Sequence, residues 1–332
     1  MRTPLLIALA VLAGCDFTPT LDVPLPEHAP ALTFNGILMA DSTVHVRVTA
    51  SADPYGAYQN EGVFPVPEGA RADLYRDGAL VAALALEDRT CLDFSVYRPG
   101  EEYPTYPCGT FVSDAVIQAG ATYTVRATAP GFPEATATVT VPKRSEISVV
   151  AGARQPGGDA LRRDLTVTFR DPVGLGHRYA LTAVSGPWTS TDSYSYCVDA
   201  TCAVERDTTV TYRYDRSTLS YTTADPVLLA GARVLPAGGE SFITFPDNLF
   251  DGTTRSFEIQ TRSLTRRDRE DPVEPAAVEV TSLDPLTYQA YQISWFSLGD
   301  DNPFQEPVRL PSNVTGGYGL LGAATVHEAL LP

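Results

Sequence analysis

The feature that most constrains the fold is the strict alternation of apolar and polar residues in many short stretches. Residues 44–50 (VHVRVTA) and 208–215 (TTVTYRYD) show this pattern. A period of two is typical of a strand that buries one face. Asp77-Gly78 and Pro130-Gly131 separate neighbouring stretches as turn residues do. We therefore expect an all-β chain.

The spacing of these stretches indicates two β-rich regions. Residues 32–142 predict a β-sandwich of the immunoglobulin-like or transthyretin-like kind. Residues 143–160 contain RQPGGDA and predict a linker, and residues 161–332 predict a second β-rich domain. In that domain, residues 163–172 and 177–185 resemble paired strands joined by a turn at VGLGH.

One helix is expected near residues 284–298. Asp284 is a favourable N-cap, and Pro285 suits the first helical position. Tyr291 and Trp295 recur at helical spacing after it, together with the flanking Leu283 and Leu298. We expect this aromatic stripe to pack on a sheet, and the alternative is a platform for a ligand.

The first residues have the pattern of a lipoprotein signal peptide. Residues 1–14 combine a short positive start with an apolar run too short to cross a bilayer, and they end at Leu12-Ala13-Gly14-Cys15. This ending resembles a lipobox, which predicts cleavage before Cys15 and acylation of that cysteine. An ordinary signal peptide with an incidental cysteine, or a short buried strand, is the alternative. Residues 15–31 are proline-rich and predict a tether.

The charge of the chain excludes some partners. The chain has 24 basic and 40 acidic residues, with a formal net charge of −16. Such an acidic chain is expected to bind neither nucleic acid nor anionic lipid by charge.

Four cysteines other than Cys15 favour disulfides in an exported protein. They are Cys91, Cys108, Cys197 and Cys202. Their order suggests Cys91–Cys108 and Cys197–Cys202, among three possible pairings. A zinc site is the less favoured alternative, because neither pair has two-residue spacing and no histidine lies near them.

No motif in the sequence indicates catalysis. The four histidines lie far apart, and there is no Gly-x-Ser-x-Gly sequence. Residues 317–322 satisfy Gly-x-Gly-x-x-Gly, but that fingerprint binds nucleotides only between a strand and a helix. We expect a glycine-dependent turn into a last strand there, and no cofactor.

Acidic clusters provide further candidate metal ligands. They contain Asp247 and Asp251 in FPDNLFDG, and Asp300 and Asp301 in GDDNPF. Carboxylates at such spacing could hold calcium, although aspartate is also favoured in turns.

The residues 302–323, NPFQEPVRLPSNVTGGYGLLGA, are the most distinctive segment. They resemble the closing motif of a lipoprotein family of the Bacteroidota catalogued as domain of unknown function 4249. Phe169-Arg170-Asp171-Pro172 and FPDNLFDG also fit that family. The resemblance implies no known activity or catalytic residue. It implies an accessory lipoprotein, because members are often encoded beside TonB-dependent outer-membrane receptors.

These features together predict a function. We expect a non-catalytic lipoprotein, anchored in the outer membrane at the cell surface, that binds a ligand or assists a TonB-dependent transporter. The periplasmic face of that membrane is the alternative location. A surface glycan hydrolase with a carboxylate pair is one alternative. A structural or adhesive surface protein is the other.

Overall fold

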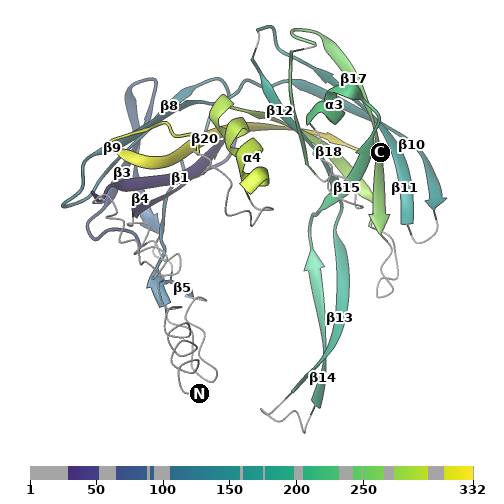
Figure 1. The fold of residues 1–332 in the computed structure, drawn as a ribbon, viewed down its shortest axis with the longest axis horizontal. Helices are drawn as coiled ribbons and strands as arrows, with labels where there is room; N and C mark the ends of the chain where they lie inside the picture. The colour runs from purple at the N-terminus through teal and green to yellow at the C-terminus, as the bar shows by residue number, and fades with distance from the viewer. Residues whose placement is uncertain are drawn as a thin grey trace, which may run out of the picture.

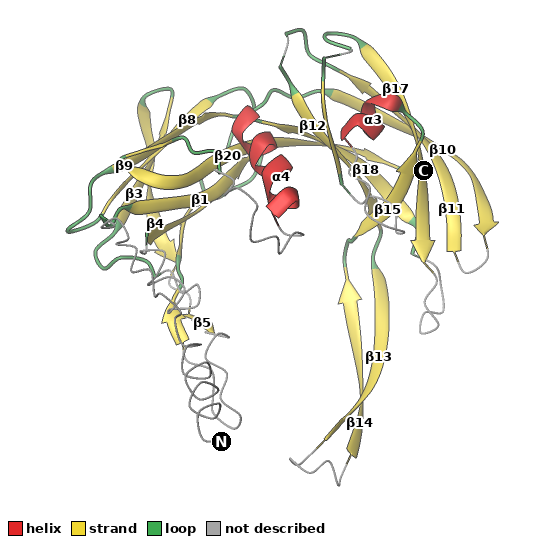
Figure 2. Cartoon of the chain, viewed as in Figure 1, coloured by secondary structure: helices red, strands yellow, loops and turns green. Residues whose placement is uncertain are grey.

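The computed structural model describes residues 29–51, 65–87, 90–92, 105–157, 160–174, 176–197, 205–231, 242–248, 250–264, 273–297 and 310–331. This part of the chain consists mostly of strands, which confirms the all-β prediction (Figures 1 and 2). None of its helices combines the length and the apolar character needed to cross a bilayer.

One continuous path of hydrogen-bonded strands runs through the molecule, and β20 (Gly317–Leu330) lies near its middle. On one side of β20 the strands follow in the order β1 (Leu32–Met39), β2 (Val44–Ala50), β7 (Thr110–Ser113), β4 (Ala79–Glu87), β3 (Arg71–Arg76), β8 (Thr122–Thr128), β9 (Ala135–Thr140) and β19 (Val314–Thr315). On the other side the order is β18 (Pro275–Leu283), β12 (Arg178–Ser185), β15 (Thr218–Thr223), β17 (Thr254–Leu264), β11 (Ala160–Arg170) and β10 (Glu146–Gly157). A short strand, β16 (Ile243–Pro246), pairs with β12.

Each side of this path curls back so that its far end contacts β20. Strands β9 and β19 contact β20 from one side, and β10 contacts it from the other. Each curled half encloses its own apolar core. The first core includes Val46, Leu74 and Phe111, and the second includes Phe169 and Phe257.

The sequence patterns identified many of these strands correctly. In β2, Val44, Val46 and Val48 are buried while His45 is exposed, as the alternation predicts. Asp77 and Gly78 both have positive φ in the turn between β3 and β4. The immunoglobulin-like or transthyretin-like topology of the first half stays a prediction.

Strand β20 connects the two halves. Its first part pairs in parallel with β1, from Gly317 opposite Leu32 to Ala324 opposite Met39. Its last part pairs antiparallel with β18. Leu321 and Ala323 accordingly lie in the first core, although they are close to the C-terminus.

The glycine-rich segment before and within β20 has a structural role. Gly316 has φ +75° between β19 and β20, which confirms the expected turn. Asn313 closes this turn, because its side-chain amide donates to the Leu321 carbonyl and its side-chain oxygen accepts the Leu321 N–H. The Gly-x-Gly-x-x-Gly sequence is part of a strand.

The expected helix is present as α4 (Pro285–Ser297). The Asp284 carboxylate accepts hydrogen bonds from the N–H groups of Leu286 and Thr287, as an N-cap does. Tyr291 contacts Phe242, with ring centroids 5.2 Å apart, and it packs with Leu283 against Ala180 and Ala324 of the sheet. The side chain of Trp295 and all of Leu298 lie outside what the structure describes.

Three expectations about this half are corrected. A second helix, α3 (Pro226–Gly231), accompanies α4, and Asp225 caps it through the Val227 N–H. The same Asp-Pro signal that marks α4 precedes it.

Residues 163–172 and 177–185 form β11 and β12, which do not pair, because β17 and β15 lie between them in the sheet. Residues 143–160, expected as a linker, include β10, which pairs with β11.

Two small two-stranded ribbons stand apart from the main sheet. One consists of β13 (Trp188–Cys197) and β14 (Glu205–Tyr214), and the other of β5 (Thr90–Leu92) and β6 (Thr105–Pro107). The longer one, called here the β13–β14 ribbon, extends well away from both cores (Figure 1). At its base Trp188 stacks on Tyr214, with ring centroids 4.1 Å apart.

Candidate functional site

A cluster of three potential ligand side chains forms where the chain turns from β11 into β12. Asp171 follows β11, His177 precedes β12, and Asp247 follows β16, which pairs with β12. One side-chain donor atom from each of the three lies within 4.8 Å of the other two. The corner is therefore assembled from segments about 70 residues apart in the chain. We call these three residues the corner cluster.

Backbone N–H groups hold Asp247 in the corner cluster. Its side chain is fully buried. Its carboxylate accepts hydrogen bonds from the N–H groups of Gly176 and His177, at 3.1 and 3.0 Å. These bonds fix the loop before β12 onto the end of β16, and they satisfy part of the hydrogen-bonding capacity of a buried carboxylate.

Asp171 is held in a similar way. Only 2% of this residue is exposed. Its carboxylate accepts hydrogen bonds from the Gly252 N–H, at 2.8 Å, and from the Tyr179 hydroxyl. Burial raises the pKa of Tyr179, and the hydrogen bond to Asp171 raises it further. Tyr179 is therefore a neutral donor to this carboxylate.

His177 joins the two carboxylates without a hydrogen bond. Its Nδ1 lies 3.6 Å from Asp171 Oδ1 and 3.4 Å from Asp247 Oδ2. The Nδ1 atom is buried and has no hydrogen-bond partner among the described residues. The His177 side chain as a whole is 35% exposed. The corner cluster can thus be reached from the surface through this ring.

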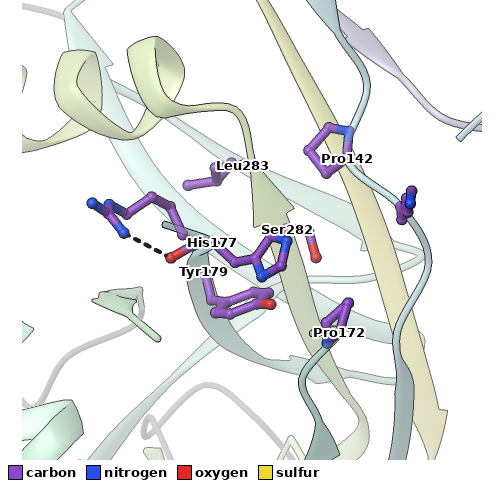
Figure 3. Close-up of a pocket in the computed structure, with 8 residues that line it drawn as sticks. Pro142, Pro172, His177, Tyr179, Ser282 and Leu283 are labelled. Carbon is purple, nitrogen blue, oxygen red and sulfur yellow. Dashed lines mark hydrogen bonds between the residues drawn. The ribbon is translucent and has the colours of Figure 1, made fainter. Parts of the chain in front are cut away.

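A small cavity lies beside the corner cluster. Figure 3 shows the His177 and Tyr179 side chains next to each other, with Pro172 and Ser282 nearby. The cavity has a volume of about 20 Å³. This is room for about one water molecule or ion. An organic ligand does not fit there.

Aromatic side chains of the second core pack around Tyr179, which is hydrogen-bonded to Asp171 of the corner cluster. The Tyr179 ring contacts Phe169 edge to face, with centroids 4.7 Å apart, and it also contacts Phe245 and Phe250. Tyr179 and its three neighbours belong to the second core. Because a packed core resists displacement, the carboxylates are held in position before any ligand arrives.

Arg178 approaches one of the two buried carboxylates, and Lys143 lines the adjacent cavity. Arg178 Nη1 is 3.7 Å from Asp247 Oδ1, and it donates a hydrogen bond to the His177 carbonyl at 2.9 Å. The Arg178 guanidinium also lies over the Tyr288 ring, 5.5 Å from its centroid. Arg178 thus faces Oδ1 of Asp247, whereas His177 faces Oδ2.

A buried histidine, His327, lies next to Ser282, which lines the same cavity. His327 Nδ1 accepts a hydrogen bond from the Ser145 N–H at 3.2 Å, and its Nε2 lies 3.0 Å from Ser282 Oγ. A backbone N–H can only donate, so Nδ1 is unprotonated and Nε2–H donates to Ser282. Burial, and secondarily the Arg144 guanidinium, lowers the pKa of His327 to about 4. It is a neutral structural group.

The structure places one of the predicted acidic residues in the corner cluster and another outside it. Asp247 belongs to the corner cluster, but Asp251 instead accepts the Gly174 N–H at 2.8 Å and steadies the turn. Asp300 and Asp301 lie outside the described residues. Sequence reasoning missed Asp171 and His177 as ligands. Asp171 stands in one family-like segment and Asp247 in another, but nothing in the sequence showed that these segments meet.

The structure describes only some of the cysteines. Cys108 is buried and disulfide-bonded. The backbone of Cys91 in β5 pairs with Tyr106, two residues before Cys108. The side chains of Cys91 and Cys197, and all of Cys15 and Cys202, lie outside what is described, so both pairings and the acylation stay predictions.

Comparison with known proteins identifies the family. No curated protein matches the chain. A sequence model of the family described as "Domain of unknown function (DUF4249)" matches residues 18–329, which is nearly the whole chain. This match confirms the resemblance noted in the closing segment. The chain belongs to the DUF4249 family.

Proposed function

We propose that this protein is a non-catalytic lipoprotein, anchored through Cys15 at the outer surface of the outer membrane, that assists a TonB-dependent receptor. The β13–β14 ribbon is the observation that carries this proposal. The partner class is the one that the family resemblance implies, and the anchor is the one that the lipobox predicts.

The ribbon has the properties of a contact arm. Its strands pair only with each other among the described residues, and Trp188 at its base packs against the second core. An isolated pair of strands is only marginally stable in water. Such a ribbon gains stability when it lies against another surface, and its open edges offer backbone N–H and C=O groups for pairing.

The predicted disulfide Cys197–Cys202 supports the same proposal. Strand β13 ends at Cys197 and β14 begins at Glu205, so this disulfide would close the loop at the far end of the ribbon. A staple at that place would stabilise an arm that has no core of its own. Its formation requires the oxidising environment that an exported protein meets.

The corner cluster fits a role in binding better than a role in turnover of a glycan. The cavity beside it has a volume of about 20 Å³. A sugar ring needs far more space than the one water molecule or ion that fits there.

The test is co-purification from native membranes in mild detergent. A variant in which Asn-Gly replaces residues 191–211 joins Ser190 to Tyr212, which face each other in the ribbon, through a short turn. We expect the wild type to recover a TonB-dependent receptor, and the shortened variant to lose most of it while it remains folded. Val150→Ser, at a 68% exposed position on β10, is the control and should retain the receptor.

Two outcomes would overturn the proposal. One is equal recovery of the receptor by the shortened variant, and the other is recovery of no receptor by the wild type. The anchor is checked separately with a fatty-acid analogue, which should label the wild type and leave Cys15→Ala unlabelled.

A further inference from the structure

We propose that Asp171, His177 and Asp247 bind one divalent transition-metal cation, with Zn²⁺ as the best fit. This inference is independent of the proposed partnership with a receptor. It rests on the geometry, burial and charge of the corner cluster.

The distances from His177 to the two carboxylates match those between ligands of one metal ion. Zinc holds nitrogen and oxygen ligands at about 2.0–2.2 Å, so two ligands of a tetrahedral site lie about 3.3–3.6 Å apart. His177 Nδ1 lies 3.6 and 3.4 Å from the nearest oxygens of Asp171 and Asp247. A hydrogen bond between these atoms would be about 2.7–2.9 Å long. The His177 imidazole therefore lies at a ligand-to-ligand distance from each of the two carboxylates.

An unpartnered buried nitrogen points to the same ligand. His177 Nδ1 is shielded from water and has no hydrogen-bond partner among the described residues. Buried polar atoms of this kind are rare, because their lost hydration is not replaced. A metal ion between Nδ1 and the two carboxylates would satisfy all three groups.

The two carboxylates accept hydrogen bonds from neighbouring groups, as ligands in metal sites do. The N–H groups of Gly176 and Gly252 orient Asp247 and Asp171. The Tyr179 hydroxyl donates a hydrogen bond to the Asp171 carboxylate. Hydrogen bonds to ligand carboxylates fix their direction, and so the site is formed in advance.

Charge and space also favour a cation. Two buried carboxylates lie close together, and the one nearby guanidinium that the structure describes, Arg178, approaches Asp247 at 3.7 Å. A divalent ion would compensate the second charge. The adjacent cavity of about 20 Å³, which His177 lines together with Lys143 and Arg178, has room for one water molecule. The partial exposure of His177 provides a path for the ion to enter.

The rival explanation is an ion triad, in which a protonated His177 bridges the two carboxylates. The two explanations differ in the effect of His177→Gln. If His177 is a charged bridge, its loss must strongly destabilise the metal-free protein, because two buried carboxylates lose their counter-charge. If His177 is a metal ligand, the metal-free protein should change little, and the effect of added zinc should disappear.

The experiment uses the full chain in detergent, freed of metal by a chelator that is then removed. Isothermal titration with Zn²⁺ should give one site per chain, and Zn²⁺ should raise the thermal midpoint. His177→Gln and Asp171→Asn should weaken binding at least about 100-fold, because even groups behind the ligands commonly account for 10–100-fold. Co²⁺ in place of Zn²⁺ should give the visible absorption of a tetrahedral site.

Matched controls use residues of the same types outside the corner cluster. Asp251→Asn removes a carboxylate of the same turn, and His45→Gln removes an exposed imidazole on β2. Both should bind Zn²⁺ as the wild type does. The proposal is overturned if the wild type binds no stoichiometric zinc. It is also overturned if His177→Gln lowers the thermal midpoint of the metal-free protein strongly, or binds zinc unchanged.

Discussion

At the scale of single residues, His327 shows how burial selects one protonation state. The residue is 5% exposed, and its two ring nitrogens have partners that fit only the neutral form. A proton on Nδ1 would face the Ser145 N–H, which cannot accept a hydrogen bond. Burial, and secondarily the Arg144 guanidinium, lowers the pKa from 6.5 to about 4 in the folded protein.

The lowered pKa of His327 predicts acid sensitivity. The unfolded chain takes up a proton at this histidine near pH 6.5, whereas the folded protein does so only near pH 4. The contribution to the free energy of unfolding is therefore complete above pH 6.5 and decreases as the pH falls toward 4, by up to about 3 kcal/mol. Urea unfolding of the wild type and of His327→Gln across this range measures the difference. The variant should lose less stability in acid, and identical losses would contradict the prediction.

At the scale of elements, β20 depends on close contact with β1. Gly319 has φ +93°, and a Cβ atom there would lie 2.0 Å from the Phe34 carbonyl oxygen of β1. Only a residue without a side chain allows the parallel pairing that continues on both sides of this point. The glycines of the closing segment therefore serve the close packing of strands.

Two glycine substitutions separate the effect of φ from the effect of crowding. Gly319→Ala should destabilise the protein by more than about 3 kcal/mol, because it combines an unfavourable φ with a clash against backbone. Gly78→Ala also has positive φ, but nothing lies within 4 Å of the added Cβ, so we expect a cost of about 1–2 kcal/mol. Chemical denaturation of both variants tests this order. Equal costs would mean that the approach of β20 to β1 is not the limiting contact.

At the scale of the whole molecule, the two curled halves share one strand. β20 contributes Leu321 and Ala323 to the first core and pairs with β18 of the second half. Neither half is complete without it. We therefore expect the two cores to unfold together, although they are separate clusters of apolar side chains.

Calorimetry of core variants tests this coupling. Leu74→Ala in the first core and Leu165→Ala in the second each remove a fully buried side chain, at an expected cost of about 2–5 kcal/mol. Wild type and both variants should each show a single thermal transition, lowered in both variants. Two transitions, of which each variant lowers only one, would show that the halves unfold independently.

The sequence by itself determined the local structure. Alternation identified strands such as β2, Asp77-Gly78 identified a hairpin turn, and Asp284-Pro285 identified the start of α4. These features depend on the period of side chains along a strand, on backbone angles and on capping. All of these act between residues close together in the chain, and so they can be read from its order.

Only the tertiary structure decided which distant segments meet. The VGLGH segment suggested a hairpin between β11 and β12, but β17 and β15 lie between these strands. That separation lets β16 bring Asp247 to Asp171 and His177. The sequence also did not show that both halves share β20. Alternation shows that a strand has a buried face but not which strand will be its neighbour, because strand pairing is set by the burial of the whole core.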